Sequence, residues 1–184
     1  MVPEEHSLRQ FFHQIVSDTY ASRLNMRDNE VTSYVADLLT EFSEADKMYR
    51  VRDANGRPVR EVGEMLKASD PVHGTAASFD AEREVRKHIG DFTLFYTGMY
   101  PESTHRFRRN EGDSFVDLVK TGKESYYIVS QFNVFEYAVE APLFAKLSAT
   151  FERCLYGLTL VREEMLRHSP GNLPQGLPEQ RLLM

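Results

Sequence analysis

Apolar residues recur every three or four positions through most of the chain, which is the pattern of helices with one buried face. The clearest example follows Asp28 and Asn29, either of which can cap a helix. Its apolar stripe consists of Val31, Tyr34, Val35, Leu38, Leu39 and Phe42. An earlier helix is predicted from about Pro3 to Ser22, because proline suits a first helical position and acidic residues follow it.

A central helix is predicted to begin near Ser78 or Asp80 and to end near Gly98. Its segment Phe92–Tyr96 is apolar almost all round, so we expect several neighbours to bury it. Gly90 is a poor helix former, and close contact with another helix is the natural explanation for its presence.

Two further helices are predicted in the second half of the chain. The first is capped by Asp113 or Ser114 and has an apolar face from Phe115 to Val129. The second begins at Pro142 and is expected to be the longest, at about 25 residues, with Cys154 on its apolar stripe. The segment 169–184 is rich in proline and glycine, and we expect it to be a flexible tail.

Residues 49–62 break the helical period and leave two alternatives open. The Asn55-Gly56 pair between alternating residues indicates a hairpin. The second interpretation, which we prefer, is a loop followed by a short helix from Pro58 to near Ser69. Residues 68–78 then form a linker within the domain. Together the patterns predict an all-α fold: residues 1–168 form a single-domain bundle of five or six helices, built on the pairing of those that carry Val31, Val85, Phe115 and Phe144.

Composition narrows the classes of function. The 184 residues carry a formal charge of −6, which disfavours non-specific nucleic-acid binding. A single cysteine excludes an internal disulfide and a cysteine-based zinc cluster. The first residues resemble no signal peptide, and no apolar run reaches the roughly 18 residues that span a bilayer. These features predict a cytoplasmic protein without a transmembrane segment.

One flank of the central helix carries possible metal ligands. Glu84, His88 and Asp91 are spaced so that they share one side of a helix. Glu102 and His105 follow as Glu-x-x-His, the spacing used in carboxylate-bridged metal sites of four-helix bundles. The alternative, which we favour, is a solvated polar face in which Asp91 pairs locally. No other cofactor is indicated.

Two other charged clusters have both a functional and a structural interpretation. Glu41, Glu44 and Asp46 gather at the end of a helix, either as part of a cation site or as a solubilising acidic end. The only compact basic cluster consists of Arg106, Arg108 and Arg109 with His105. Guanidinium groups suit the recognition of anions, but pairing with nearby acids is the favoured alternative.

Several residues give the chain a resemblance to a known family. These are Gly90-Asp91, Leu94-Phe95, Gly98 and Tyr100-Pro101-Glu102, together with the earlier Tyr-Val-Ala-Asp-Leu-Leu-Thr-Glu-Phe. In these residues the chain resembles a family of uncharacterised bacterial all-helical proteins. The resemblance implies a helical fold and a bacterial source, and it implies no activity or cofactor.

Three hypotheses for the function follow. The preferred one is a non-catalytic binding or assembly module that takes a protein partner or forms a homo-oligomer, with the C-terminal Leu-Leu-Met as a further docking segment. The second is a metal- or haem-dependent enzyme that uses the His and carboxylate cluster. The third is a sensor of anionic ligands that uses the arginine-rich loop. No P-loop, nucleophile elbow or zinc-protease motif is present in the sequence.

Overall fold

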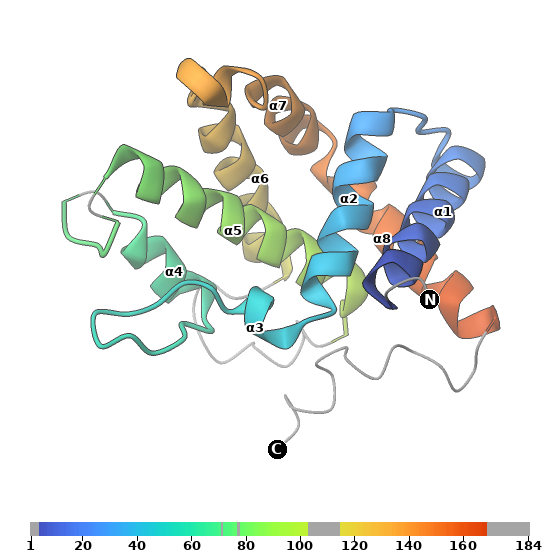
Figure 1. Cartoon of the computed structure of the whole chain (residues 1–184), viewed down its shortest axis with the longest axis horizontal. Helices are drawn as coiled ribbons and strands as arrows, with labels where there is room; N and C mark the ends of the chain where they lie inside the picture. Colours follow the sequence, from blue (N-terminus) through green and yellow to red (C-terminus); the bar gives the residue numbers. More distant parts are fainter. Residues whose placement is uncertain (1–3, 71, 77, 103–114, 169–184) are drawn as a thin grey trace. The chain divides into compact units, whose positions relative to one another are not determined.

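A computed structural model describes residues 4–70, 72–76, 78–102 and 115–168 (Figure 1). Within these ranges the chain forms eight α-helices and one 3-10 helix without a β-strand. The predicted all-helical class is therefore confirmed, with more helices than the five or six expected. Tertiary contacts group the chain into two compact units, one within residues 1–48 and 156–184 and the other within residues 49–155. None of the described helices is long and apolar enough to cross a bilayer.

The first unit contains α1 (Glu4–Leu24), α2 (Asn29–Phe42), the short α3 (Ala45–Met48) and most of α8 (Phe151–His168). Helices α1 and α2 pack against each other. Of the two predicted cap residues, Asp28 caps α2, because its side chain accepts hydrogen bonds from the backbone N–H groups of Glu30 and Val31. Helices α8 and α1 also approach closely: a Cβ atom at Gly157 would lie 2.4 Å from the ring of Tyr20.

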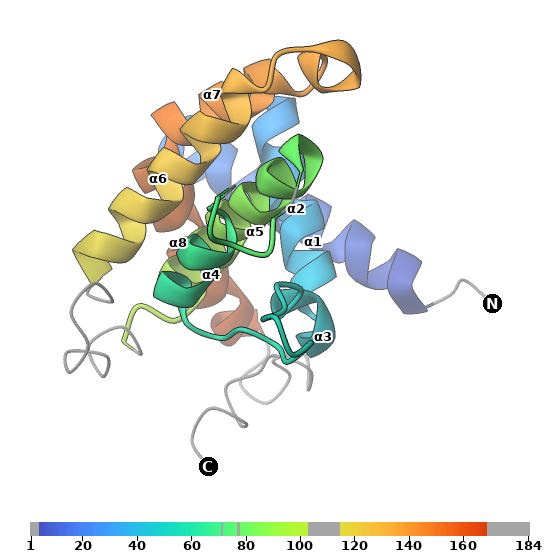
Figure 2. The same cartoon turned by 90° about the vertical axis from the view of Figure 1, so that its left-hand side faces the viewer.

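The second unit is centred on α5 (Phe79–Met99), which packs against α6 (Phe115–Gln131), while α6 packs against α7 (Ala141–Ala149) (Figures 1 and 2). Helix α4 (Val62–Ala68) lies against α5. Every residue from His88 to Tyr100 is buried, which confirms the predicted burial of the segment Phe92–Tyr96 on all sides. Ser78 caps α5 by accepting a hydrogen bond from the backbone N–H of Ala81. The pairing of α2 with these helices stays a prediction.

The single long helix expected from Pro142 onward is wrong. The chain forms two helices, α7 and α8, instead. They are separated by Thr150, whose backbone is not helical (φ −110°, ψ 18°). The Thr150 hydroxyl donates to the carbonyl of Lys146 (2.7 Å), and Ser148 Oγ donates to the carbonyl of Lys123 on α6 (2.9 Å). Hydroxyl groups that bond to backbone carbonyls compete with regular helix geometry, and here they also tie the end of α7 to α6.

The segment 49–62 contains a part of each predicted alternative. Arg52 and Pro58 form one isolated antiparallel bridge around a turn in which Gly56 has φ 76°. The side chain of Asp53 stabilises this turn by accepting hydrogen bonds from the backbone N–H groups of Asn55 and Arg57. The expected helix start at Pro58 is wrong because Pro58 belongs to the bridge, and α4 begins at Val62.

Candidate functional site

Three predicted ligands on α5 lie beside the same cavity. Glu84, His88 and Asp91 all line a space of about 260 Å³ between α5 and the segments that contain Arg50, Arg52 and Thr75. Glu84 is exposed, whereas His88 and Asp91 are only 6% and 3% exposed. The favoured expectation of a solvated polar face is therefore wrong for His88, while the local pairing of Asp91 is confirmed by its contact with Lys87.

Both oxygens of the Asp91 carboxylate are engaged by other side chains. Lys87 Nζ lies 2.9 Å from Oδ2, one helical turn away on α5. The hydroxyl of Tyr126 on α6 donates to Oδ1 across 2.7 Å in the buried interior. A buried carboxylate is stable when it has a charge partner and hydrogen-bond donors of this kind. Asp91 therefore joins α5 to α6.

Sharing a cavity does not make the predicted ligands a metal site. Glu84 Oε1 pairs with Arg83 Nη1 (2.9 Å), and Glu102 lies in an exposed turn after α5. Among the described residues, no group of three or more histidine, cysteine, aspartate or glutamate side chains could hold a metal ion. His105 lies outside the described ranges, so the complete five-residue site stays a prediction.

The structure describes the predicted acidic cluster and Cys154 but not the predicted arginine cluster. Arg106, Arg108 and Arg109 lie outside the described residues. Glu44 pairs with Lys47 of α3 across 2.9 Å, which agrees with the solvated acidic end that we favoured. Cys154 is fully buried, as its position on the apolar stripe predicted.

A different surface, between α6 and α7, exposes large apolar side chains to solvent. The 3-10 helix η2 (Phe135–Ala138) follows α6 and buries none of its residues. Phe135 is 89% exposed and Val139 is 84% exposed, and Val134 and Phe79 are exposed as well. Phe135 also has φ 50°, a left-handed conformation that L-residues with large side chains rarely adopt. We call Phe79 and Val134–Glu140 the aromatic surface.

Contacts with the first turns of α5 hold the aromatic surface in place. The Tyr137 hydroxyl donates to Asp80 Oδ1 across 2.8 Å. The guanidinium of Arg83 lies 4.1 Å from the centre of the Tyr137 ring, and its Nη2 donates to Glu140 Oε2 across 2.7 Å. Arg83 is itself only 3% exposed. A buried cation therefore holds in place a segment whose apolar side chains face solvent.

The charge around the aromatic surface is negative. Asp80, Glu136 and Glu140 are exposed, and residues 131–143 contain neither lysine nor arginine. The hydrogen bond to Asp80 raises the pKa of the Tyr137 hydroxyl, with smaller contributions in the same direction from burial and from the neighbouring carboxylates. The nearest cation, Arg83, is committed to Glu84 and Glu140.

Comparisons with protein-family models, with curated proteins and with solved structures found no match for this chain. The aromatic surface was not predicted from the sequence, because the apolar residues between Gln131 and Pro142 follow neither a helical nor a strand period. The available signal was the group Val134, Phe135 and Val139 in a stretch without a basic residue, just before a proline that opens a helix.

Proposed function

We propose that the chain is a non-catalytic protein-binding module that docks its partner on the aromatic surface. The observation that carries this proposal is Phe135, which combines 89% exposure with a left-handed backbone. Such a conformation costs of the order of 1–3 kcal/mol and persists only where the surrounding structure enforces it. A strained residue that presents a large apolar side chain to solvent contributes nothing evident to stability, which supports a role in binding.

The segment around Phe135 is fixed before any partner arrives. Tyr137 and Glu140 are each bonded to α5, and the backbone N–H of Tyr137 donates to the carbonyl of Val134 across 3.1 Å. An aromatic side chain on a pre-ordered segment loses little conformational entropy on binding, which is a feature of residues that dominate binding energy.

The charges indicate the kind of partner. Exposed carboxylates flank an apolar centre, so the complementary surface is an apolar pocket for Phe135 bordered by lysine or arginine. A symmetric dimer through this surface would place the same carboxylates opposite each other, which is unfavourable. We therefore infer a different protein as the partner, with a basic and apolar binding segment.

A peptide-display selection against the intact chain tests this proposal. We expect the selected peptides to combine basic with aromatic or aliphatic residues, and their binding to weaken as salt concentration rises. Phe135→Gly should abolish binding and at the same time raise the free energy of unfolding by about 1 kcal/mol, because glycine tolerates the left-handed conformation. If Phe135→Gly is more stable than the unmodified chain and still does not bind, the loss of binding cannot result from a loss of folding.

Val116→Ser is the matched control, because Val116 is a 72% exposed residue at the other end of α6. It should leave peptide binding unchanged. Acidic peptides, or peptides that bind Phe135→Gly equally well, would contradict the proposal, as would a selection without binders. Self-association that is lost in Phe135→Gly, measured by light scattering, would identify a second copy as the occupant and overturn the inference of a different partner.

A further inference from the structure

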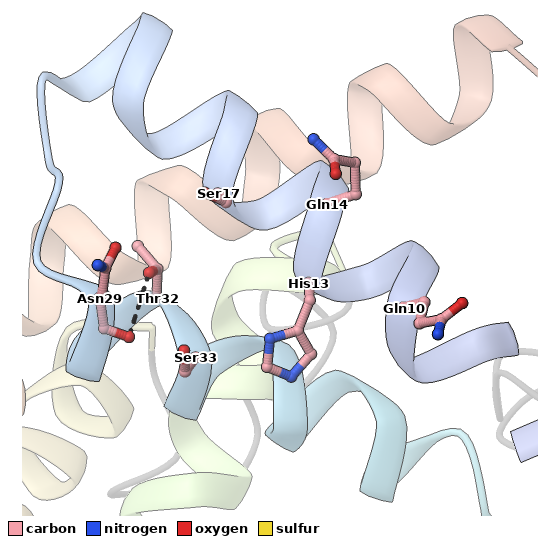
Figure 3. A pocket seen from close by; sticks show the side chains of 7 residues that line it. All are labelled: Gln10, His13, Gln14, Ser17, Asn29, Thr32 and Ser33. Atoms are coloured by element: carbon pink, nitrogen blue, oxygen red, sulfur yellow. Dashed lines mark hydrogen bonds between the residues drawn. The ribbon is translucent and has the colours of Figure 1, made fainter. Parts of the chain in front are cut away.

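The first unit contains a pocket that is lined only by residues with polar side chains. It has a volume of about 510 Å³ and lies between α1 and α2 (Figure 3). Helix α1 contributes Gln10, His13, Gln14 and Ser17, and helix α2 contributes Asn29, Thr32 and Ser33. Apart from the imidazole ring of His13, the lining contains no aromatic side chain, and it contains no aliphatic and no permanently charged side chain. The volume is typical of sites for small molecules, but the chemistry of the walls is not that of a site for an apolar ligand.

His13 has a defined orientation in this pocket. Its Nε2 lies 2.7 Å from Asp37 Oδ1, and Arg9 Nε donates to the same oxygen across 2.9 Å. Although partial burial acts in the opposite direction, the hydrogen bonds from Arg9 and His13 hold the pKa of Asp37 below its ordinary value. The carboxylate is therefore ionised at neutral pH and accepts hydrogen bonds only.

The contact with Asp37 determines the tautomer of His13. Because an ionised carboxylate only accepts, Nε2 carries a proton, so Nδ1 is the nitrogen that can accept a hydrogen bond whenever the ring is neutral. Ser33 lies one turn before Asp37 on the same face of α2. Figure 3 shows Nδ1 of His13 on the side of the ring where Ser33 lies. The pocket thus combines an oriented acceptor with hydroxyl and amide groups that both donate and accept.

The charges near the pocket disfavour an anion. Asp37 is bonded to His13, Asp18 accepts a hydrogen bond from Gln14 (2.8 Å), and Asp28 caps α2 next to Asn29. Arg9, the cation beside Asp37, does not line the pocket. A neutral ligand with several hydroxyl groups matches the lining best, because each hydroxyl both donates and accepts a hydrogen bond.

We propose that the pocket between α1 and α2 binds a small neutral polyhydroxylated molecule, such as a sugar or a cyclitol, whose hydroxyl group donates to His13 Nδ1. Gln10, Asn29 and Ser33 supply the other polar contacts. This binding site is independent of the aromatic surface, which belongs to the second unit. It adds a small-molecule site to a protein-binding module.

Titration of the isotopically labelled chain with D-glucose, D-ribose and myo-inositol, followed by NMR, tests this proposal. We expect at least one probe to cause saturable shifts confined to residues of the pocket, including the His13 ring. His13→Phe keeps a ring of similar shape but removes the acceptor, so it should weaken binding about 3- to 10-fold, the value of one hydrogen bond. Gln10→Ala, a change at an exposed position, provides a second variant that retains the fold and should also weaken binding.

His6→Phe is the matched control, because His6 is an exposed histidine of α1 that does not line the pocket. It should leave the titration unchanged. The absence of saturable shifts with all three probes overturns the proposal, as do shifts outside the pocket. Inorganic phosphate that binds at these residues in place of the polyols would show an anion site and overturn it as well.

Discussion

Glycine at position 90 leaves room for an aromatic ring. A Cβ atom there would lie 2.5 Å from Cδ1 and Cε1 of Tyr126, a side chain that is fully buried between Phe144 and Phe151. The ring cannot shift without disturbing these neighbours and the hydrogen bond to Asp91. The sequence predicted close contact at Gly90, since glycine is costly inside a helix. It did not predict the partner, because the helical period specifies a face and not the residue opposite it.

Gly90→Ala should therefore destabilise the fold. Forcing a methyl group into a packed interior costs about 1–3 kcal/mol, and this outweighs the gain of up to about 1 kcal/mol in helix propensity. Urea denaturation measures the difference as a lower midpoint with an unchanged slope.

Gly63→Ala is the control for this prediction. Gly63 lies in α4, and a Cβ atom there would have no neighbour within 4 Å. Only the propensity gain applies, so this variant should be as stable as the unmodified chain or more stable. Equal effects of the two substitutions would show that the ring of Tyr126 does not restrict position 90.

At the scale of elements, the helical period of apolar residues predicted where helices form. It did not predict the features that depend on hydrogen bonds between particular side chains and their partners. Helices α1, α2, α5 and α6 followed from apolar periods and helix-start signals, and the observed caps Asp28 and Ser78 were each one of two predicted candidates. The interruption at Thr150 did not follow, because Phe144 and Phe151 continue one stripe across it. It depends on hydroxyl groups that bond to carbonyls, including one on α6. The site showed the same limit: the shared flank of Glu84, His88 and Asp91 was predictable, but the engagement of Asp91 by Tyr126 was not.

The pairing of α1 with α2 should depend on pH through Asp37. Its pKa is lower in the folded chain than in the unfolded chain, because the hydrogen bonds from Arg9 and His13 outweigh the effect of partial burial. A group with a lowered folded pKa contributes stability above its unfolded value, about 3.9, and this contribution is lost as the pH falls through the folded value. Chemical denaturation should therefore show Asp37→Asn less stable than the unmodified chain at neutral pH, with the difference shrinking below about pH 4.

Asp46→Asn controls for the change in net charge, since it removes an exposed carboxylate from α3. Asp53 and Asp70, whose pKa values are lowered by hydrogen bonds from backbone N–H groups, respond to acid in both chains and cancel in the comparison. A difference between Asp37→Asn and the unmodified chain that stays constant from neutral pH to pH 3 would contradict the role assigned to Asp37.

At the scale of the whole molecule, burial is distributed unevenly along the second unit. The buried run from His88 to Tyr100 comprises the second half of α5 and its C-cap residue, and the backbone groups of the helix are bonded within it and covered by neighbours. Residues 52–58 are exposed, and one bridge and an aspartate-stabilised turn hold them. Local opening needs little free energy where few apolar contacts are lost. Two segments of one unit should therefore open by different routes.

Hydrogen exchange followed by mass spectrometry checks this expectation. Backbone amides of Ile89–Thr97 should exchange only when the unit unfolds, and those of residues 52–58 should exchange through local opening at far lower free energy. Adding urea separates the two routes, because unfolding exposes much surface and its exchange accelerates with urea, whereas local opening responds weakly. Gly90→Ala should accelerate exchange in Ile89–Thr97 and leave residues 52–58 unchanged, since it lowers the free energy of unfolding without touching the turn. Equal acceleration of both segments would show that the turn opens only together with α5, and the uneven distribution of stability would then be wrong.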